Sequence, residues 1–240
     1  MKLLFITFFS LLLFRAGAQE KFYNDPNARA RTLNGSFSAV SVSSGVELIL
    51  SKSSINALAV SAASEEDFAR LTTTVENGVL KIYVDTKGMK WVNHKKDKLK
   101  AYLSFTQLDK IMAQSGALVS ADKQISAASL YLSASSGSQV NLNVKTRRLS
   151  TVASSGSLLK ISGSTNLLDA KASSGSSIKG YDMTTQTCTA KSSSGSSIRI
   201  TIEKELNAHA SSGGQVRYKG NGVVKDINVS SGGTIKKENS

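Results

Sequence analysis

The sequence predicts an all-β protein: a right-handed parallel β-helix (solenoid) with coils of 18–21 residues, preceded by an atypical β-rich N-terminal region that contains a hairpin. Three observations support this prediction. A Ser-Gly pair recurs at near-constant intervals, aliphatic residues stand at fixed distances from each pair, and apolar and polar residues alternate on both sides of it. Alternation with a period of two is typical of strands, and a fixed repeat of this length is typical of a solenoid.

The recurring glycine defines the length of one coil. From residue 113 onward, successive glycines lie 18 to 21 residues apart, and one earlier glycine has the same surroundings. The eight glycines are Gly45, Gly116, Gly137, Gly156, Gly175, Gly195, Gly213 and Gly232. We expect each of them to form a structural turn between two strands, because glycine adopts a positive φ without steric cost.

A serine stands immediately before every one of these glycines. These serines are Ser44, Ser115, Ser136, Ser155, Ser174, Ser194, Ser212 and Ser231. We expect their hydroxyl groups to bond backbone groups that the turn leaves unpaired, or to bond the serine of the next coil. A flexible Gly/Ser linker is disfavoured, because such linkers lack regularly spaced aliphatic residues.

Two columns of apolar residues flank the glycines. Three residues after each glycine stand Leu48, Val119, Val140, Leu159, Ile178, Ile198, Val216 and Ile235. Three residues before stand Val42, Ala113, Ala134, Ala153, Ala172, Ser192, Ala210 and Val229, of which seven are apolar. Parallel stacking would place equivalent residues about 4.8 Å apart, so that these columns form ladders inside the core. A right-handed coil is expected because parallel crossovers favour that hand.

The N-terminal region departs from the repeat. Between Gly45 and Gly116 the dipeptide Asn77-Gly78 separates two alternating runs, which indicates a hairpin. Ser64 begins a capping-box-like start to a short helix, and two further short strands follow within 99–114. We therefore divide the chain into four parts. These are a signal peptide (1–18), an N-terminal extension (19–35), a β-rich region (36–112) that caps the solenoid, and the β-helix repeats (113–240).

The first 18 residues read as a secretory signal peptide. Lys2 is followed by the apolar run 3–14 and by the small residues 16–18, which predicts cleavage near Ala18-Gln19. The apolar run is too short to span a bilayer, and no other segment is suited to do so. We therefore expect an exported, soluble protein located in the periplasm, at the cell surface or outside the cell.

The mature chain is strongly basic. Removal of Lys2 and Arg15 lowers the formal charge from +13 to +11. An exported protein of this charge would meet acidic glycans, lipopolysaccharide phosphates or other anionic envelope components. Nucleic acid is disfavoured as a partner, because the compartment is wrong and no aromatic-rich basic motif is present.

The sequence offers no recognisable metal, cofactor or redox site. The single cysteine, Cys188, rules out an internal disulfide and stands in a column otherwise occupied by buried leucines, so we expect it to fill the core. The two histidines, His94 and His209, lack the spacing of metal ligands, and His209 is expected at the surface.

Two classes of function remain open. Parallel β-helices include polysaccharide lyases and glycosidases, but glycoside cleavage ordinarily requires a pair of carboxylates. Glu203 and Glu205 would share one strand face without a third group, which favours solvated surface residues. We therefore expect a non-enzymatic binding or structural module, with a β-helix carbohydrate-active enzyme as the alternative.

One basic segment is the candidate ligand-binding site. It runs from Lys87 to Lys100 and includes the only tryptophan. The predicted ligand-binding residues are Lys90, Trp91, Lys95, Lys96 and Lys98. An aromatic ring beside cations can hold an acidic sugar by stacking and charge. The alternative is a solvated loop in which the tryptophan folds back onto the core. The row of serine corners is a second candidate surface, although turn stacking explains it as well.

The chain resembles the auto-transporter adhesin head GIN domain family. The resemblance rests on the recurrent SSGS-x-[VI] units, the opening "FSAVSVSSGVELIL", the "VENGVLKIYVD" hairpin and the closing "GGQVRYKGNG", and it covers residues 36 to 235. It implies a β-helical fold and an adhesin or surface role, and it transfers no catalytic residues. Members of the family usually carry Gly-Ser-Gly-Asp in the turns, so Ser-Ser-Gly-Ser here removes a row of acidic residues that could bind cations.

Overall fold

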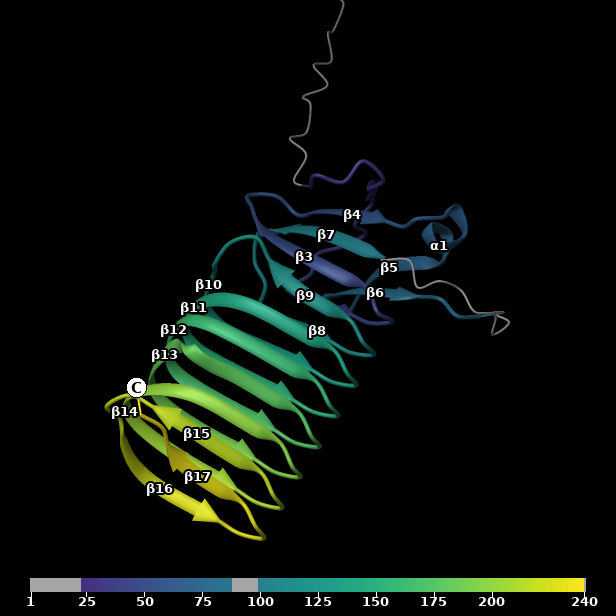
Figure 1. Ribbon diagram of the computed structural model, residues 1–240. Coiled ribbons are helices and arrows are strands. Elements are labelled where there is room, and N and C mark those ends of the chain that lie inside the picture. The colour runs from purple at the N-terminus through teal and green to yellow at the C-terminus, as the bar shows by residue number, and fades with distance from the viewer. Residues whose placement is uncertain (1–22, 88–98, 240) are drawn as a thin grey trace, which may run out of the picture.

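The strands of the protein form one 17-stranded sheet that winds into a solenoid (Figure 1). The computed structural model describes residues 23–87 and 99–239. The predicted all-β class is confirmed, with stacked coils of about 19 residues that pair in parallel through the repeat region. No helix within these described residues is long or apolar enough to cross a membrane.

Each coil contributes to two layers that face each other across the core. Layer A contains the chain that follows each Ser-Gly corner, and layer B contains the chain that leads up to it. Among the strands of the glycine coils, four are confined to layer A: β3 (Glu47–Lys52), β9 (Leu118–Ala121), β15 (Gln215–Lys219) and β17 (Thr234–Lys237). Those confined to layer B are β2 (Ala39–Val42), β8 (Lys110–Ala113) and β16 (Val223–Val229).

Five long strands pass from layer A to layer B through a second corner. They are β10 (Ile125–Ala134), β11 (Gln139–Ala153), β12 (Leu158–Ala172), β13 (Ser177–Ser192) and β14 (Ser197–Ala210). In β11 the alternation of buried and exposed residues changes phase at Arg147 and Arg148, and the pairing with β12 skips Arg147. We call this bend the far corner, because it lies at the end of the coil opposite the glycine turn.

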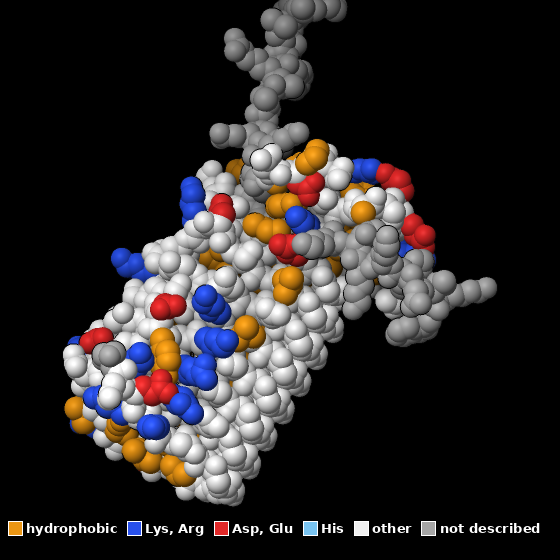
Figure 2. All heavy atoms as spheres, in the orientation of Figure 1, with side chains coloured by type: hydrophobic (Ala, Val, Ile, Leu, Met, Phe, Trp, Pro, Cys, Tyr) orange, Lys and Arg blue, Asp and Glu red, His pale blue; other side chains and the backbone are white. Residues whose placement is uncertain are grey.

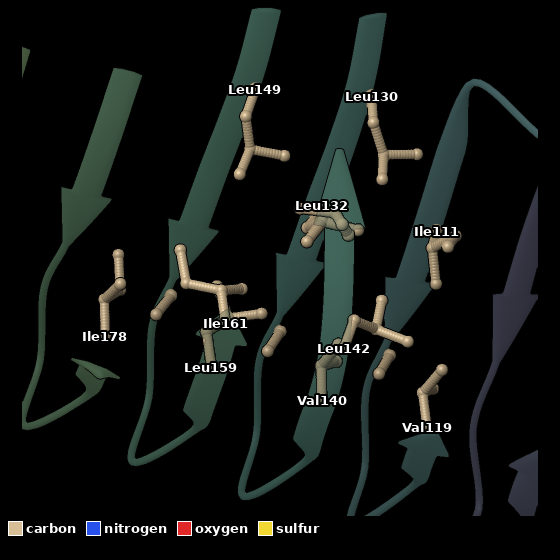
Figure 3. Close-up of a cluster of buried hydrophobic side chains, with 14 of the residues drawn as sticks. Ile111, Val119, Leu130, Leu132, Val140, Leu142, Leu149, Leu159, Ile161 and Ile178 are labelled. Carbon is tan, nitrogen blue, oxygen red and sulfur yellow. The ribbon is translucent and has the colours of Figure 1, made fainter. Parts of the chain in front are cut away.

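The predicted columns of apolar residues lie in register inside the core (Figure 3). Val140 pairs with Leu159, which pairs with Ile178, and all three are buried. The burial of the apolar columns ends at the last coil, where Ile227 is 55% exposed and Val229 is 49% exposed. Both are exposed because no further coil of the described chain stacks on them.

The first glycine coil stacks directly on the second, although 71 residues separate their glycines in sequence. β2 pairs with β8 through Val40 and Ile111, and β3 pairs with β9 through Leu48 and Val119. The chain between them leaves the stack and returns to it. This excursion forms the N-terminal cap, and the sheet runs without a break across the 112/113 boundary.

The cap closes one end of the stack. β6 (Val79–Val84) stacks in parallel on β2, and β7 (Lys100–Phe105) stacks in parallel on β3. Antiparallel strands then complete both layers: β5 (Leu71–Glu76) on β6, β4 (Ala57–Ser61) on β7, and β1 (Arg29–Arg31) on β4. The predicted hairpin is confirmed, with φ of 51° at Asn77 and 74° at Gly78.

The predicted short helix is also present. α1 (Glu65–Arg70) begins after Ser64, whose hydroxyl oxygen accepts a hydrogen bond from the backbone N–H of Asp67 at 3.1 Å. This contact satisfies one of the free N–H groups of the first turn, as an N-cap serine is expected to do.

Candidate functional site

The glycine corner is a tight turn with two consecutive residues of positive φ. In the coil of Gly137, φ is 51° at Ser136 and 73° at Gly137, and the N–H of Ser138 donates to the carbonyl of Ser135 at 3.1 Å. All eight predicted corner glycines have positive φ, which confirms that expectation. The positive φ of the preceding serine was not predicted. It is the same two-residue geometry that Asn-Gly adopts in the N-terminal hairpin.

The serine before the corner glycine was expected to form the hydrogen bonds of the turn, and this prediction was wrong. The serine after the glycine forms them instead. Within the described chain, Ser136 makes no side-chain hydrogen bond, whereas the buried Ser138 makes two. Its Oγ accepts from the N–H of Ser135 at 2.9 Å and donates to the carbonyl of Ala113, in the preceding coil, at 2.9 Å. The same arrangement recurs at Ser157, Ser176 and Ser196. In these four coils the serine after the glycine therefore staples the turn to its neighbour, because that side chain points into the stack. The other four corner glycines are followed by Val46, Ala117, Gly214 and Gly233.

The corners are also joined through their backbone. The N–H of Gly137 donates to the carbonyl of Ser155 in the next coil at 3.0 Å, and equivalent bonds connect the corners from Gly45 to Ser231. A Cβ added to Gly137 would meet no atom within 4 Å, so the outer side of the corner is open. The row consequently appears as a ridge without charged side chains along one edge of the stack (Figure 2). Its outer hydroxyls face solvent.

The predicted ligand-binding residues Lys90, Trp91, Lys95, Lys96 and Lys98 lie outside the described residues. The structure does show where their segment leaves and rejoins the stack. The N–H of Ser43 donates to the carbonyl of Ile82, and the N–H of Glu47 donates to the carbonyl of Leu99 at 2.8 Å. These bonds place the described chain before and after the segment, at Ile82 and Leu99, on either side of the first glycine corner.

A column of cations runs along the outside of layer A, four residues after each of the last five corner glycines. Its members pair with one another in register from coil to coil. We call it the cationic ladder, and it consists of Lys160, Lys179, Arg199, Arg217 and Lys236. Lys and Arg side chains form a band along the coils on the face shown in Figure 2. The ladder was not predicted, because a row of exposed cations does not define the core of a strand repeat as the apolar columns do.

A single carboxylate contacts the ladder within the described chain. Glu238 Oε1 accepts a hydrogen bond from Arg217 Nη1 at 2.8 Å, and Glu238 Oε2 accepts one from the hydroxyl of Tyr181. These two bonds lower the pKa of Glu238. Burial and the same contact raise the pKa of Tyr181 to about 12. The Nζ of Lys219 lies 5.1 Å from the centre of the Tyr181 ring, which adds a cation–π contact.

Three basic residues on layer B have a different environment, because an acidic side chain lies beside each of them. Lys171 Nζ lies 3.2 Å from Asp169, and Lys225 Nζ lies 3.8 Å from Glu205. His209 Nε2 lies 3.6 Å from Asp226, which agrees with its predicted surface position. Glu205, one of the two carboxylates considered for an enzyme, is thus an ion-pair partner of a lysine.

Cys188 lies in the core column that the sequence predicted. It pairs in register with Leu168 and Leu206 and is fully buried. Burial raises the pKa of its thiol, and the nearby Asp169 adds to the effect. Among residues 23–87 and 99–239, no three His, Cys, Asp or Glu side chains lie close enough to hold a metal ion together. His94 lies outside the described residues.

The family described as "Putative auto-transporter adhesin, head GIN domain" matches residues 36–222. The chain belongs to this family. The match begins just before the first glycine coil and ends shortly before the last, so the head GIN domain comprises the cap and most of the solenoid. No match is found among curated proteins.

Solved structures share this fold. A putative adhesin from Bacteroides fragilis NCTC 9343 superposes with a TM-score of 0.78 at 16% identity, covering 88% of this chain and 96% of that one. A protein from Parabacteroides distasonis ATCC 8503, described as a putative lipid binding protein, has a TM-score of 0.65 at 17% identity, with 88% and 96% coverage. A putative adhesin from Parabacteroides merdae ATCC 43184 has a TM-score of 0.62 at 16% identity, with 90% and 98% coverage. At such low identity the likeness establishes the fold alone.

Proposed function

We propose that this head GIN domain is an exported, non-enzymatic, adhesin-like binding module that acts through the extended outer surface of its solenoid. The observation that carries the proposal is the in-register stacking of the coils. Stacking repeats each outward-facing side chain about every 4.8 Å, so the surface presents straight rows of similar chemistry to a partner. Membership of an adhesin-head family supports a binding role.

The proposed ligands are acidic glycans or other anionic envelope components. The mature chain would carry a formal charge of +11, which attracts anionic polymers over the distance of a Debye length. Lys90, Trp91, Lys95, Lys96 and Lys98 are the proposed first contact. The described chain before and after their segment hydrogen-bonds beside the first glycine corner, so a ligand held by these residues would be close to the exposed serine hydroxyls.

Export is part of the same proposal. A signal peptide over residues 1–18, cleaved near Ala18-Gln19, would deliver the domain to the compartment in which envelope glycans occur. Mass spectrometry of the mature protein tests this step, because cleavage leaves Gln19 as the first residue.

A glycan-array experiment tests the binding role. Wild type is compared with a variant carrying Lys95→Glu, Lys96→Glu and Lys98→Glu, and a matched control reverses three exposed lysines elsewhere: Lys123, Lys145 and Lys204. We expect wild type and control to bind acidic glycans at low salt, and the first variant to lose that binding. Absence of wild-type binding to every glycan, whatever the salt concentration, would contradict the proposal. Release of reducing sugar from a polysaccharide panel would favour the enzymatic alternative instead.

A further inference from the structure

The cationic ladder places like charges next to one another on five successive coils. Lys160 pairs with Lys179 and Lys179 pairs with Arg199, and the register continues through Arg217 to Lys236. Adjacent coils of a parallel sheet are about 4.8 Å apart, well within the Debye length at physiological salt. Like charges that face each other across neighbouring strands are destabilising. The ladder therefore opposes the folding of the solenoid.

Compensating acidic residues are placed elsewhere. Within the described chain only one ladder residue, Arg217, forms an ion pair with a carboxylate, that of Glu238. On layer B, by contrast, Lys171, Lys225 and His209 each lie within 4 Å of an acidic side chain. Ion pairs with carboxylates thus occur at three positions on layer B but at one of the five ladder residues, which indicates that the ladder on layer A meets negative charge from outside.

Glu238 shows how the ladder holds a carboxylate. One of its oxygens accepts from the guanidinium of Arg217, and the other accepts from the phenol of Tyr181. The side chain of Glu238 is 27% exposed and that of Arg217 is 37% exposed, so both lie at the surface. A guanidinium and a phenol hydroxyl together form a two-pronged carboxylate clamp. An outside carboxylate could use the same clamp after displacing Glu238.

The column beside the ladder is suited to sugar hydroxyls. Two residues after the last six corner glycines stand Gln139, Leu158, Ser177, Ser197, Gln215 and Thr234, of which five are polar and uncharged. Hydroxyl and amide groups that line a straight row of cations match a chain that carries both hydroxyls and charges.

We propose that the cationic ladder binds a linear polyuronate, a polysaccharide with a carboxylate on each successive sugar. The inference rests on the binding role proposed above and names the ligand class and the surface. The chain would lie along the solenoid axis across β12, β13, β14, β15 and β17, with carboxylates meeting cations at intervals of one coil or two, about 4.8 or 9.6 Å. Each exposed contact is weak, but linked contacts reinforce one another because the second binds at a high effective concentration.

Alginate oligosaccharides are the probe for this site, with dextran as the uncharged control. Binding of each to wild type is measured by isothermal titration calorimetry at low salt. The ladder variant carries Lys160→Gln and Lys179→Gln, and the matched control carries Lys171→Gln and Lys191→Gln on layer B. All four lysines are exposed, and both variants lose the same charge. We expect alginate affinity to fall about tenfold in the ladder variant and about twofold or less in the control.

A second variant acts in the opposite direction. Glu238→Gln removes the carboxylate that occupies the clamp of Arg217 and Tyr181, so we expect alginate to bind several-fold more tightly than to wild type. Loss of a merely structural contact would not strengthen binding. Circular dichroism of each variant confirms that the fold is retained before affinities are compared.

Three outcomes would overturn the assignment: no alginate binding to wild type, equal losses in the ladder and layer B variants, or tight binding of heparin fragments without binding of alginate. The first and third leave the broader function standing if the array detects other acidic glycans that depend on Lys95, Lys96 and Lys98. Failure of every acidic glycan on the array would contradict both proposals together.

Discussion

A buried serine follows four of the eight corner glycines, and it is the position where a small substitution tests the corner most directly. Ser157 Oγ accepts from the N–H of Ser154 at 3.1 Å and donates to the carbonyl of Ala134 in the preceding coil at 2.8 Å. Ser155, two residues earlier, is exposed and makes no side-chain hydrogen bond within the described chain. Ser157→Ala and Ser155→Ala therefore remove the same oxygen from the same turn, with and without its partners.

The expected cost follows from the hydrogen bonds that are lost. Each contributes about 0.5–1.5 kcal/mol to the free energy of unfolding. The N–H of Ser154 keeps a backbone bond to the carbonyl of Ala134 at 3.0 Å, so neither partner becomes fully unsatisfied. We therefore expect Ser157→Ala to lower the free energy of unfolding by about 1–2 kcal/mol, towards the lower end of two lost bonds. Ser155→Ala should change it by less than about 0.5 kcal/mol.

Urea unfolding followed by far-ultraviolet circular dichroism measures both variants against wild type. The midpoint should fall for Ser157→Ala and stay near wild type for Ser155→Ala, while the slope with urea stays constant. Thermal unfolding should show a loss of about 2–8 °C for the first variant. Equal effects of the two substitutions, or a larger effect of Ser155→Ala, would refute the assignment of the staple to the buried serine.

Three further predictions concern other parts of the solenoid. Gly214→Ser restores the serine of the preceding coils, yet it should destabilise by about 2 kcal/mol or more, because its Cβ would lie 2.3 Å from the carbonyl oxygen of Ser192; a stable variant in urea unfolding would contradict this. Cys188 should react with a thiol reagent only after unfolding, since burial raises its pKa; rapid labelling of the native protein would contradict its position. Tyr181 should ionise near pH 12 in wild type and at lower pH in Glu238→Gln, as read from tyrosinate absorbance. Because this pKa is raised, the stabilisation linked to neutral Tyr181 is complete below about pH 10 and is lost as the pH rises through 12; an unchanged pKa in the variant would contradict the contact.

The core could be predicted from the sequence because burial constrains residue type at every coil. Val140, Leu159 and Ile178 are aliphatic at a constant distance from glycine, and the structure stacks them in register. The hairpin at Asn77-Gly78 was equally readable, because its turn requires positive φ at both residues. Burial and turn geometry restrict the residue types at these positions, so both features can be predicted from a single sequence.

Other features depend on distances that a sequence does not contain. Val40 and Ile111 are neighbours only because the cap leaves the stack and returns to it. Ser136 and Ser138 look alike in the sequence, and only the direction in which each side chain points separates the exposed hydroxyl from the staple. The sequence repeat contains the cationic ladder. Its lack of paired carboxylates, apart from Glu238, depends on which side chains the fold brings together.

Successive coils share the same turn and the same buried columns, so the solenoid consists of similar repeating units along its length. A coil such as residues 157–175 pairs in the sheet with the coils before and after it, so its duplication would preserve the pairing register of the stack. Each added coil would extend the row on layer A by one cation. The number of charges offered to a polymer can therefore change in whole steps through internal duplication or deletion of about 19 residues, without redesign of the core.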